Sequence, residues 1–162
     1  MKRGSTIIMR CSVIIAGIIM IAICSVMAWI TFTEGKSATA YHVDYVLVIL
    51  IIGTYIAAIP YFIALRQTLK LLDYIDTNRA FTELSVKALK TVEHCAIADF
   101  IICIAGGAPF FWMLGRSDGN PGMVFLGLIP AGVAFIIAVF ASLLKHLLSD
   151  AIAAKSENDL TI

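Results

Sequence analysis

Asp99 is the residue of this sequence whose type and position most directly suggest chemistry. It is the one acid well inside an apolar stretch that covers about residues 95–114. A charged side chain in hydrocarbon costs a few kcal/mol or more unless it is paired, neutralised or hydrated. We therefore expect Asp99 to face the interior of a helix bundle. There it could relay a proton or cation, anchor a cationic ligand, act as a protonation switch, or bond to polar neighbours in a structural role.

A metal site around Asp99 is not expected, although Cys95, Asp99 and Cys103 recur four residues apart beside His94. Residues eight apart on a helix lie about 12 Å apart along its axis, so the two cysteines cannot ligate one ion. The other two cysteines also lack metal-type spacing, and we expect all four to be reduced packing residues without a cofactor. No nucleophile with a base, paired catalytic carboxylates or phosphate-binding glycine loop occurs, so an enzyme is not expected.

The elements that must position Asp99 are membrane-spanning helices. Of the 162 residues, 60% are hydrophobic and 14% are charged, which argues against a soluble globular domain and leaves no room for a separate catalytic domain. Crossing about 30 Å of hydrocarbon takes roughly 20 apolar residues. Four stretches meet or nearly meet that length, at about 7–32, 45–65, 92–114 and 123–144. The chain, 1–162, is therefore predicted to be one all-α domain, a four-helix membrane bundle.

The distribution of Lys and Arg predicts the orientation of these spans, because basic residues resist translocation. Of the 12 basic residues, ten lie on the side that holds both termini, and only Lys36 and Arg116 lie on the other. We therefore expect both termini in the cytoplasm. Near the outer ends of the spans, Trp29 and Trp112 are expected to be interfacial anchors rather than the lining of a ligand pocket.

The inner connection, 66–91, has the pattern of a cytoplasmic helical hairpin. The second span is expected to continue into the cytosol and to break at 76–78, after which Thr82 caps a helix that runs directly into the third span. Phe81 is placed to form a hydrophobic staple near this cap. The charges of the hairpin are nearly balanced, so direct nucleic-acid binding is not expected. Its candidate partner-binding residues are Asp73, Asp76, Arg79 and Phe81.

The cytoplasmic tail, 145–162, is expected to be helical to about Ala154 and polar beyond it. It is too short to fold alone, but it could add as a strand to the sheet edge of a partner, dock against the inner hairpin, or stay disordered. Its candidate partner-binding residues are Glu157, Asn158, Asp159, Leu160 and Ile162.

Prolines and small residues suggest how the spans pack. Pro60, Pro109 and Pro130 each interrupt a span and could line a cavity, and 106–109 is expected to end regular helix near the outer surface. The small residues Ala134, Ala138 and Ser142 form a four-residue series suited to close helix packing. We expect that packing within the bundle rather than between protomers, and nothing in the pattern decides for or against a homodimer.

Four segments carry a resemblance to a known family: 1–6 (MKRGST), 71–76 (LLDYID), 80–87 (AFTELSVK) and 155–162 (KSENDLTI). Together they resemble the YoaS-like family of small bacterial integral membrane proteins, a domain of unknown function. The resemblance covers essentially the whole chain, but it supplies no established activity. It implies a four-span protein of the bacterial cytoplasmic membrane whose gene often lies beside one for a small helix-turn-helix repressor.

Two functional hypotheses follow. In the first, the protein is a membrane tether or sensor that binds a cytosolic partner, such as a helix-turn-helix transcription regulator, through its inner hairpin and tail. In the second, it is a small transporter or a membrane-stress or bacteriocin-resistance factor in which Asp99 and the proline-broken spans form a polar path. The lipid bilayer is a partner in both hypotheses.

Overall fold

The computed structural model describes residues 3–34, 43–77, 81–117, 119 and 122–159, and every element in these ranges is helical. α1 covers Arg3–Glu34 and α2 covers Val43–Asp76. α3 (Glu83–Ile102), the π-helical segment η1 (Cys103–Gly107) and α4 (Ala108–Ser117) follow one another without a break. α5 covers Gly122–Asp159. The predicted all-α class is therefore confirmed.

The junction between α2 and α3 follows the local sequence pattern. α2 ends at Asp76, and α3 begins at Glu83 directly after Thr82, as predicted. Thr82 stands at the N-cap position with an extended backbone, φ −135° and ψ 156°, but its side chain makes no capping hydrogen bond, so the predicted cap is correct in position only. Its carbonyl accepts hydrogen bonds from the Ser85 and Val86 amides at 3.0 and 3.4 Å. These bonds close the first turn of the helix. Phe81 is 62% exposed, which leaves most of its ring outside any staple.

Residues 106–109 do not end the helix, contrary to expectation. Instead, η1 widens the helix by one turn of π type, in which the Ala108 amide bonds to the Cys103 carbonyl. Pro109 then stands in the first turn of α4. A proline lacks an amide hydrogen and its ring collides with the carbonyl four residues back in a regular α-helix. A wider π turn relieves that collision, so the chain continues as a helix with a local irregularity.

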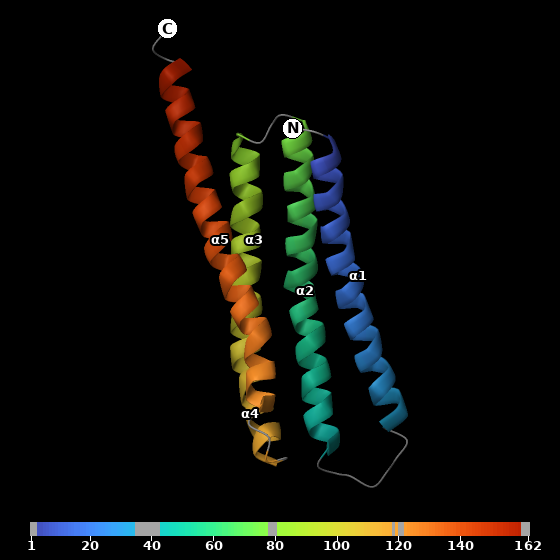
Figure 1. The fold of residues 1–162 in the computed structure, drawn as a ribbon. Coiled ribbons are helices and arrows are strands. Elements are labelled where there is room, and N and C mark those ends of the chain that lie inside the picture. The colour runs from blue at the N-terminus through green and yellow to red at the C-terminus, as the bar shows by residue number, and fades with distance from the viewer. Residues whose placement is uncertain (1–2, 35–42, 78–80, 118, 120–121, 160–162) are drawn as a thin grey trace.

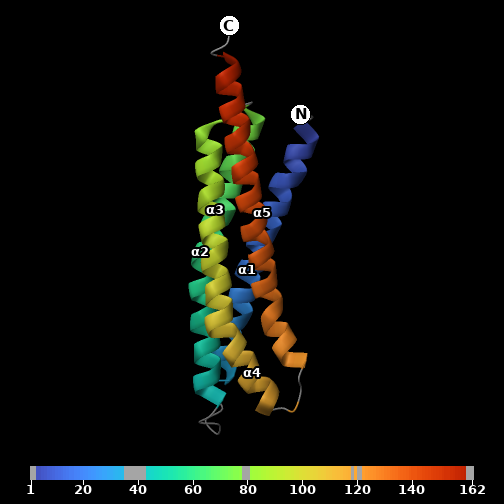
Figure 2. The same cartoon turned by 90° about the vertical axis from the view of Figure 1, so that its left-hand side faces the viewer.

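The helices form a row in which each contacts its neighbour, in the order α1, α2, α3 and α5, with α4 also packed against α5. Figure 1 shows α1 at one edge of the row and α5 at the other, with α1 diverging from α2 toward the end opposite the N-terminus. The start of α1, the α2–α3 junction and the end of α5 lie at the same end of the bundle, and Figure 2 shows the same arrangement from the side.

The core is narrow and built from small side chains. Close helix packing needs small residues at the contact, and both helices of the α3–α5 contact, the alanine seam, carry buried alanines: Ala88 and Ala96 on α3, and Ala131, Ala138 and Ala141 on α5. Of the small-residue series proposed from the sequence, Ala138 is buried, whereas Ala134 and Ser142 are half-buried. Gly127 continues the seam toward α4, where it is buried against the Phe111 ring.

The surface of the bundle is apolar along most of its length. Large hydrophobic side chains are exposed along the length of α1 and α5, among them Ile8, Ile18, Ile129 and Phe140. A helix that is hydrophobic all round belongs in a protein core or in lipid. Among the described residues, three segments are long and apolar enough to cross a membrane: Thr6–Trp29, Glu83–Trp112 and Gly127–Glu157.

Candidate functional site

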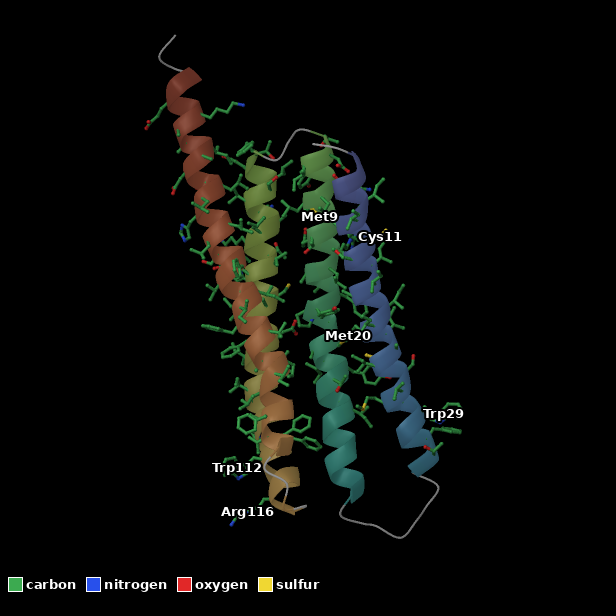
Figure 3. The ribbon with its side chains drawn as sticks, viewed as in Figure 1. Met9, Cys11, Met20, Trp29, Trp112 and Arg116 are labelled. Carbon is green, nitrogen blue, oxygen red and sulfur yellow. The ribbon has the colours of Figure 1, made fainter. Side chains whose placement is uncertain are left out.

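Exposed aromatic side chains mark one end of the apolar surface. Trp29, Trp112 and Phe125 are 72%, 63% and 70% exposed. Figure 3 shows Trp29 and Trp112 at the end of the bundle opposite the N-terminus, pointing outward on opposite sides. These two rings therefore do not line a common pocket. Their placement is that of aromatic anchors at a membrane interface.

Charged side chains mark the other end of the same surface. About 19 or 20 residues separate the three aromatic side chains from Arg10, Glu93 and Lys145 on the same helical rods, which corresponds to roughly 30 Å, the thickness of a hydrocarbon core. The apolar surface between the two sets has the height of a bilayer. Depth in the apolar layer can therefore be counted along each helix from the charged boundary. Asp99 follows Glu93 by six residues, and at about 1.5 Å per residue it lies about 9 Å inside that boundary.

Asp99 has an unmet polar atom in the interior of the bundle. Its Oδ1 atom is buried and has no hydrogen-bond partner among the described residues. A buried carboxylate oxygen without a donor is costly, and the cost is higher inside lipid than in a soluble protein. The sequence also left open a structural role in which polar neighbours hydrogen-bond to Asp99. That role is not supported at Oδ1. Asp99 is therefore the intramembrane candidate that most needs a proton or a ligand.

Tyr61 is the polar side chain that α2 contributes near this depth. Its hydroxyl donates a hydrogen bond to the Ala16 carbonyl of α1 at 3.1 Å, and the phenol also lies within electrostatic range of the Asp99 carboxyl. One side chain thus stands between the helix at the edge of the row and the acid in the bundle. This role is not predicted from the sequence, because tyrosines in spans are common and the sequence alone does not determine the register between α1 and α2.

Glu93 and Lys145 form an ion pair at the charged boundary. Lys145 Nζ donates to Glu93 Oε2 at 2.5 Å, and the Lys145 and Glu93 side chains are only 21% and 14% exposed, respectively. The pair therefore links α3 to α5. It was not predicted from the sequence, but a signal was present: the third span begins with an acid and the fourth ends with a base, so antiparallel packing brings opposite charges to one depth.

Asp73 and Asp76, two of the candidate partner-binding residues, bond within the chain. Arg10 of α1 donates from Nη2 to Asp73 Oδ1 and to Asp76 Oδ2, the second contact at 2.8 Å. The three side chains are 37% to 59% exposed, so solvent screens these pairs. Their carboxylates are nevertheless occupied by α1. Asp73 and Asp76 are therefore structural contacts between α1 and α2 in this structure, and binding of a partner would be an additional role.

The remaining candidate residues lie at the same end of the bundle. Phe81 is exposed beside the start of α3, and Glu157 is exposed on α5. Asn158 and Asp159 continue the α5 helix, although their side chains are outside the described set. Arg79, Leu160 and Ile162 lie outside the described residues.

The tail differs from expectation in one respect: α5 does not stop near Ala154. It runs to Asp159, and Figure 1 shows its last turns projecting beyond the α2–α3 junction. Nothing from 151 to 157 is a helix breaker, and alanine, lysine and glutamate favour helix. Within the described range, the tail therefore presents a helix rather than an extended strand.

The cysteines do not form a cluster. Cys11, Cys24, Cys95 and Cys103 are free thiols. Among the described residues, no group of three or more His, Cys, Asp or Glu side chains is arranged to hold a metal ion.

Comparison with known proteins adds a family but no activity. A family model described as "Protein of unknown function (DUF2975)" matches residues 32–162. A relative from Bacillus subtilis (strain 168), described as "Uncharacterized membrane protein YoaS", is 39% identical over 163 residues, and the match covers the whole of both chains. No solved structure matches.

Proposed function

Because this chain belongs to the DUF2975 family, as its resemblance to YoaS-like proteins predicted, and the family carries no assigned activity, we propose its function from geometry. The protein is a four-span membrane tether with both termini in the cytosol of a bacterium. It binds a soluble partner through the end of the bundle that holds the α2–α3 junction and the projecting part of α5.

The four-span topology is supported by the position of α2. α2 has 34 residues, about 51 Å of helix, and it packs between α1 and α3. Three of the rods contain segments apolar enough to span a membrane, and a helix packed along two of them shares their depth. The excess of Lys and Arg at the end that holds the termini favours the cytosol for that end.

The observation that carries the tether proposal is the length of α5. It has 38 residues, or about 57 Å of helix, and only about 30 Å is needed to cross the hydrocarbon. The excess lies on one side, because about 14 residues, or roughly 21 Å, follow Lys145. A helix that extends beyond the bilayer exposes its side chains to soluble proteins. Its exposed acids, Asp150 and Glu157, favour a basic partner surface.

A helix-turn-helix regulator is the partner class that we propose. The family resemblance suggests it through gene neighbourhood, and the acidic end of α5 suggests it through charge, because a DNA-binding surface is basic. Binding there would compete with DNA and hold the regulator at the membrane.

The test measures binding of the purified regulator encoded beside the gene to the full-length protein in lipid nanodiscs. Removing residues 157–162 is expected to abolish binding, and adding salt is expected to weaken it. Lys155→Gln is the matched control, because it changes one charge on the same turn of α5 without removing an acid, and it is expected to bind at least as well. Equal binding by the full-length and shortened proteins would contradict a role for the tail.

A second function is favoured by one observation, the buried and unpartnered oxygen of Asp99. In this alternative the protein is a small transporter or a membrane-stress or bacteriocin-resistance factor with a polar path through Asp99. Asp99→Asn keeps the shape and removes the charge, so it should remove flux or resistance without loss of protein from the membrane. Unchanged activity in this variant would exclude the path.

A further inference from the structure

Tyr61 is one of two tyrosines whose hydroxyls, among the described residues, donate hydrogen bonds from α2 to α1. Its hydroxyl is bonded to the Ala16 carbonyl at 3.1 Å. A second tyrosine, Tyr55, makes a longer contact of 3.4 Å with the Cys24 carbonyl farther from the charged boundary. Because the extensive packing of α1 is with α2 alone, α1 can move without disturbing the alanine seam between α3 and α5. These two hydroxyls are therefore candidates for controlling how closely α1 packs against α2.

Asp99 and Tyr61 lie at the same depth in neighbouring helices. α2 and α3 are antiparallel and packed together, and the two residues stand about 16 or 17 residues from the two ends of their junction, which places both roughly 25 Å from it. The Asp99 carboxyl acts electrostatically on the Tyr61 phenol, and its buried Oδ1 atom has no hydrogen-bond donor among the described residues. The acid whose Oδ1 atom lacks a donor thus lies within electrostatic range of a hydroxyl that donates to another group.

We propose that Asp99 is an intramembrane proton-binding site, and that the Tyr61 hydroxyl exchanges between the Ala16 carbonyl and the Asp99 carboxylate according to whether the proton is bound. The inference depends on neither proposed function, because it concerns the protein alone. If the tether proposal also holds, it supplies a way for the membrane domain to regulate the tether, since the start of α1 and the end of α5 lie at the same end of the bundle.

The exchange follows from the relative strength of the two hydrogen bonds. A neutral Asp99 carboxyl carries its own O–H donor and does not compete strongly for Tyr61, which stays on the Ala16 carbonyl. When the proton leaves Asp99 for water on the cytosolic side, the charged carboxylate is the stronger acceptor, because hydrogen bonds to ionised groups are about twice as strong as neutral ones. Tyr61 then turns to Asp99 and keeps its own proton. One bond to α1 is lost, and α1 loosens from α2.

The ionisable groups around Asp99 are few, so the site can be isolated experimentally. Among the described residues of the elements packed around it, they are Tyr61 of α2, Cys95 of α3, Cys103 of η1, and Lys145 of α5 with its partner Glu93. The Lys145–Glu93 pair lies about 9 Å nearer the charged boundary and is already neutralised internally.

The first experiment tests whether Asp99 holds a proton. Dicyclohexylcarbodiimide reacts with protonated carboxyl groups in apolar surroundings, so the reconstituted protein is treated with it at neutral pH and the modified residue is located by mass spectrometry. We expect modification at Asp99 that falls as the pH is raised. If sodium ions or a small alkylamine at fixed pH protected Asp99 from modification, the ligand of the site would be a cation rather than a proton, and the proposal would be overturned. No modification of Asp99 at any pH would overturn the site.

The second experiment measures the position of α1. Spin labels are placed at Ile18 on α1 and Ile137 on α5, both on exposed faces, in a background without native cysteines, and their separation is measured in nanodiscs at about pH 6 and about pH 9, on either side of neutrality. We expect the separation to increase or its distribution to broaden at the higher pH. A separation unchanged across this range would overturn the coupling.

Three variants assign the effect to the proposed pair. Asp99→Asn cannot lose a proton and should hold the low-pH separation throughout. Tyr61→Phe lacks the shared donor and should show the loosened state at both pH values. Tyr55→Phe, which removes the other tyrosine contact to α1, is the matched control and should keep the pH response. A response that survives in Asp99→Asn or in Tyr61→Phe, or that disappears in Tyr55→Phe, would overturn the exchange.

Discussion

Replacing Gly127 with alanine tests the close packing of α4 against α5. Gly127 is buried, and a Cβ atom at this position would lie 2.5 Å from Cδ2, 2.7 Å from Cγ and 2.8 Å from Cβ of Phe111. Separations this short do not occur between carbon atoms in contact. Because the Phe111 Cβ atom is attached directly to the backbone, a rotation of the ring cannot relieve the overlap, and the two helices must move apart.

The expected cost of Gly127→Ala is about 1–3 kcal/mol, the range found for overpacked cores. Gly132 supplies the matched control, since it is on the same helix, is exposed, and has nothing within 4 Å of an added Cβ. Alanine is the better helix former by roughly 1 kcal/mol in water, and both substitutions share that gain. The difference between the two variants therefore isolates the clash with Phe111.

The assay is reversible unfolding in mixed micelles, followed by the loss of helical circular dichroism as the fraction of denaturing detergent rises. Gly127→Ala is expected to unfold earlier than Gly132→Ala, and Phe111→Ala, which removes Cγ and Cδ2, should recover part of the loss when combined with it. Equal stability of the two alanine variants would refute the packing described between α4 and α5. A double variant no better than the single one would place the strain somewhere other than Phe111.

Three further predictions concern charges and a turn. Lys145→Met leaves Glu93 unpaired in a mostly buried position and should lower stability by about 1–3 kcal/mol, measured in the same micelle assay, whereas exchanging the two charges should restore part of it. Arg10→Ala should cost only about 0–1 kcal/mol because its ion pairs are well exposed, and raising the salt concentration should remove that difference. Gly119 has φ +64°, so Gly119→Ala should cost about 1 kcal/mol, while Gly119→Asn should cost less.

The sequence predicted the elements better than their contacts. The break after Asp76, the start of a helix after Thr82 and its continuation into the third span were all predicted, because local propensity decides them. The π segment was not predicted, since a Gly-Gly-Ala-Pro run signals a disturbance without saying whether the helix ends or widens. Whether the helix ends or widens there depends on its packing against neighbouring helices. In the structure, η1 contacts α2, α3 and α5.

The candidate site was predicted in part. Asp99 stands out in any hydropathy pattern because it is an acid in an apolar run. Its relation to Tyr61 depends on the register between α2 and α3, and the sequence does not fix that register before the junction is known. For the same reason Asp73 and Asp76 looked open to a partner, although they lie opposite Arg10 once α1 is placed.

The measurement that tests the central claim most directly is the side of the membrane on which each end of α2 and α5 lies. Single cysteines at Lys36, Arg116 and Ser156, in a cysteine-free background, are exposed to a membrane-impermeant maleimide in spheroplasts and in inverted vesicles. Four spans with cytosolic termini predict labelling of Lys36→Cys and Arg116→Cys only in spheroplasts, and of Ser156→Cys only in inverted vesicles. Labelling of positions 36 and 156 from one side and of position 116 from the other would show that only one of α2 and the α3–α4 segment crosses, and would contradict the account.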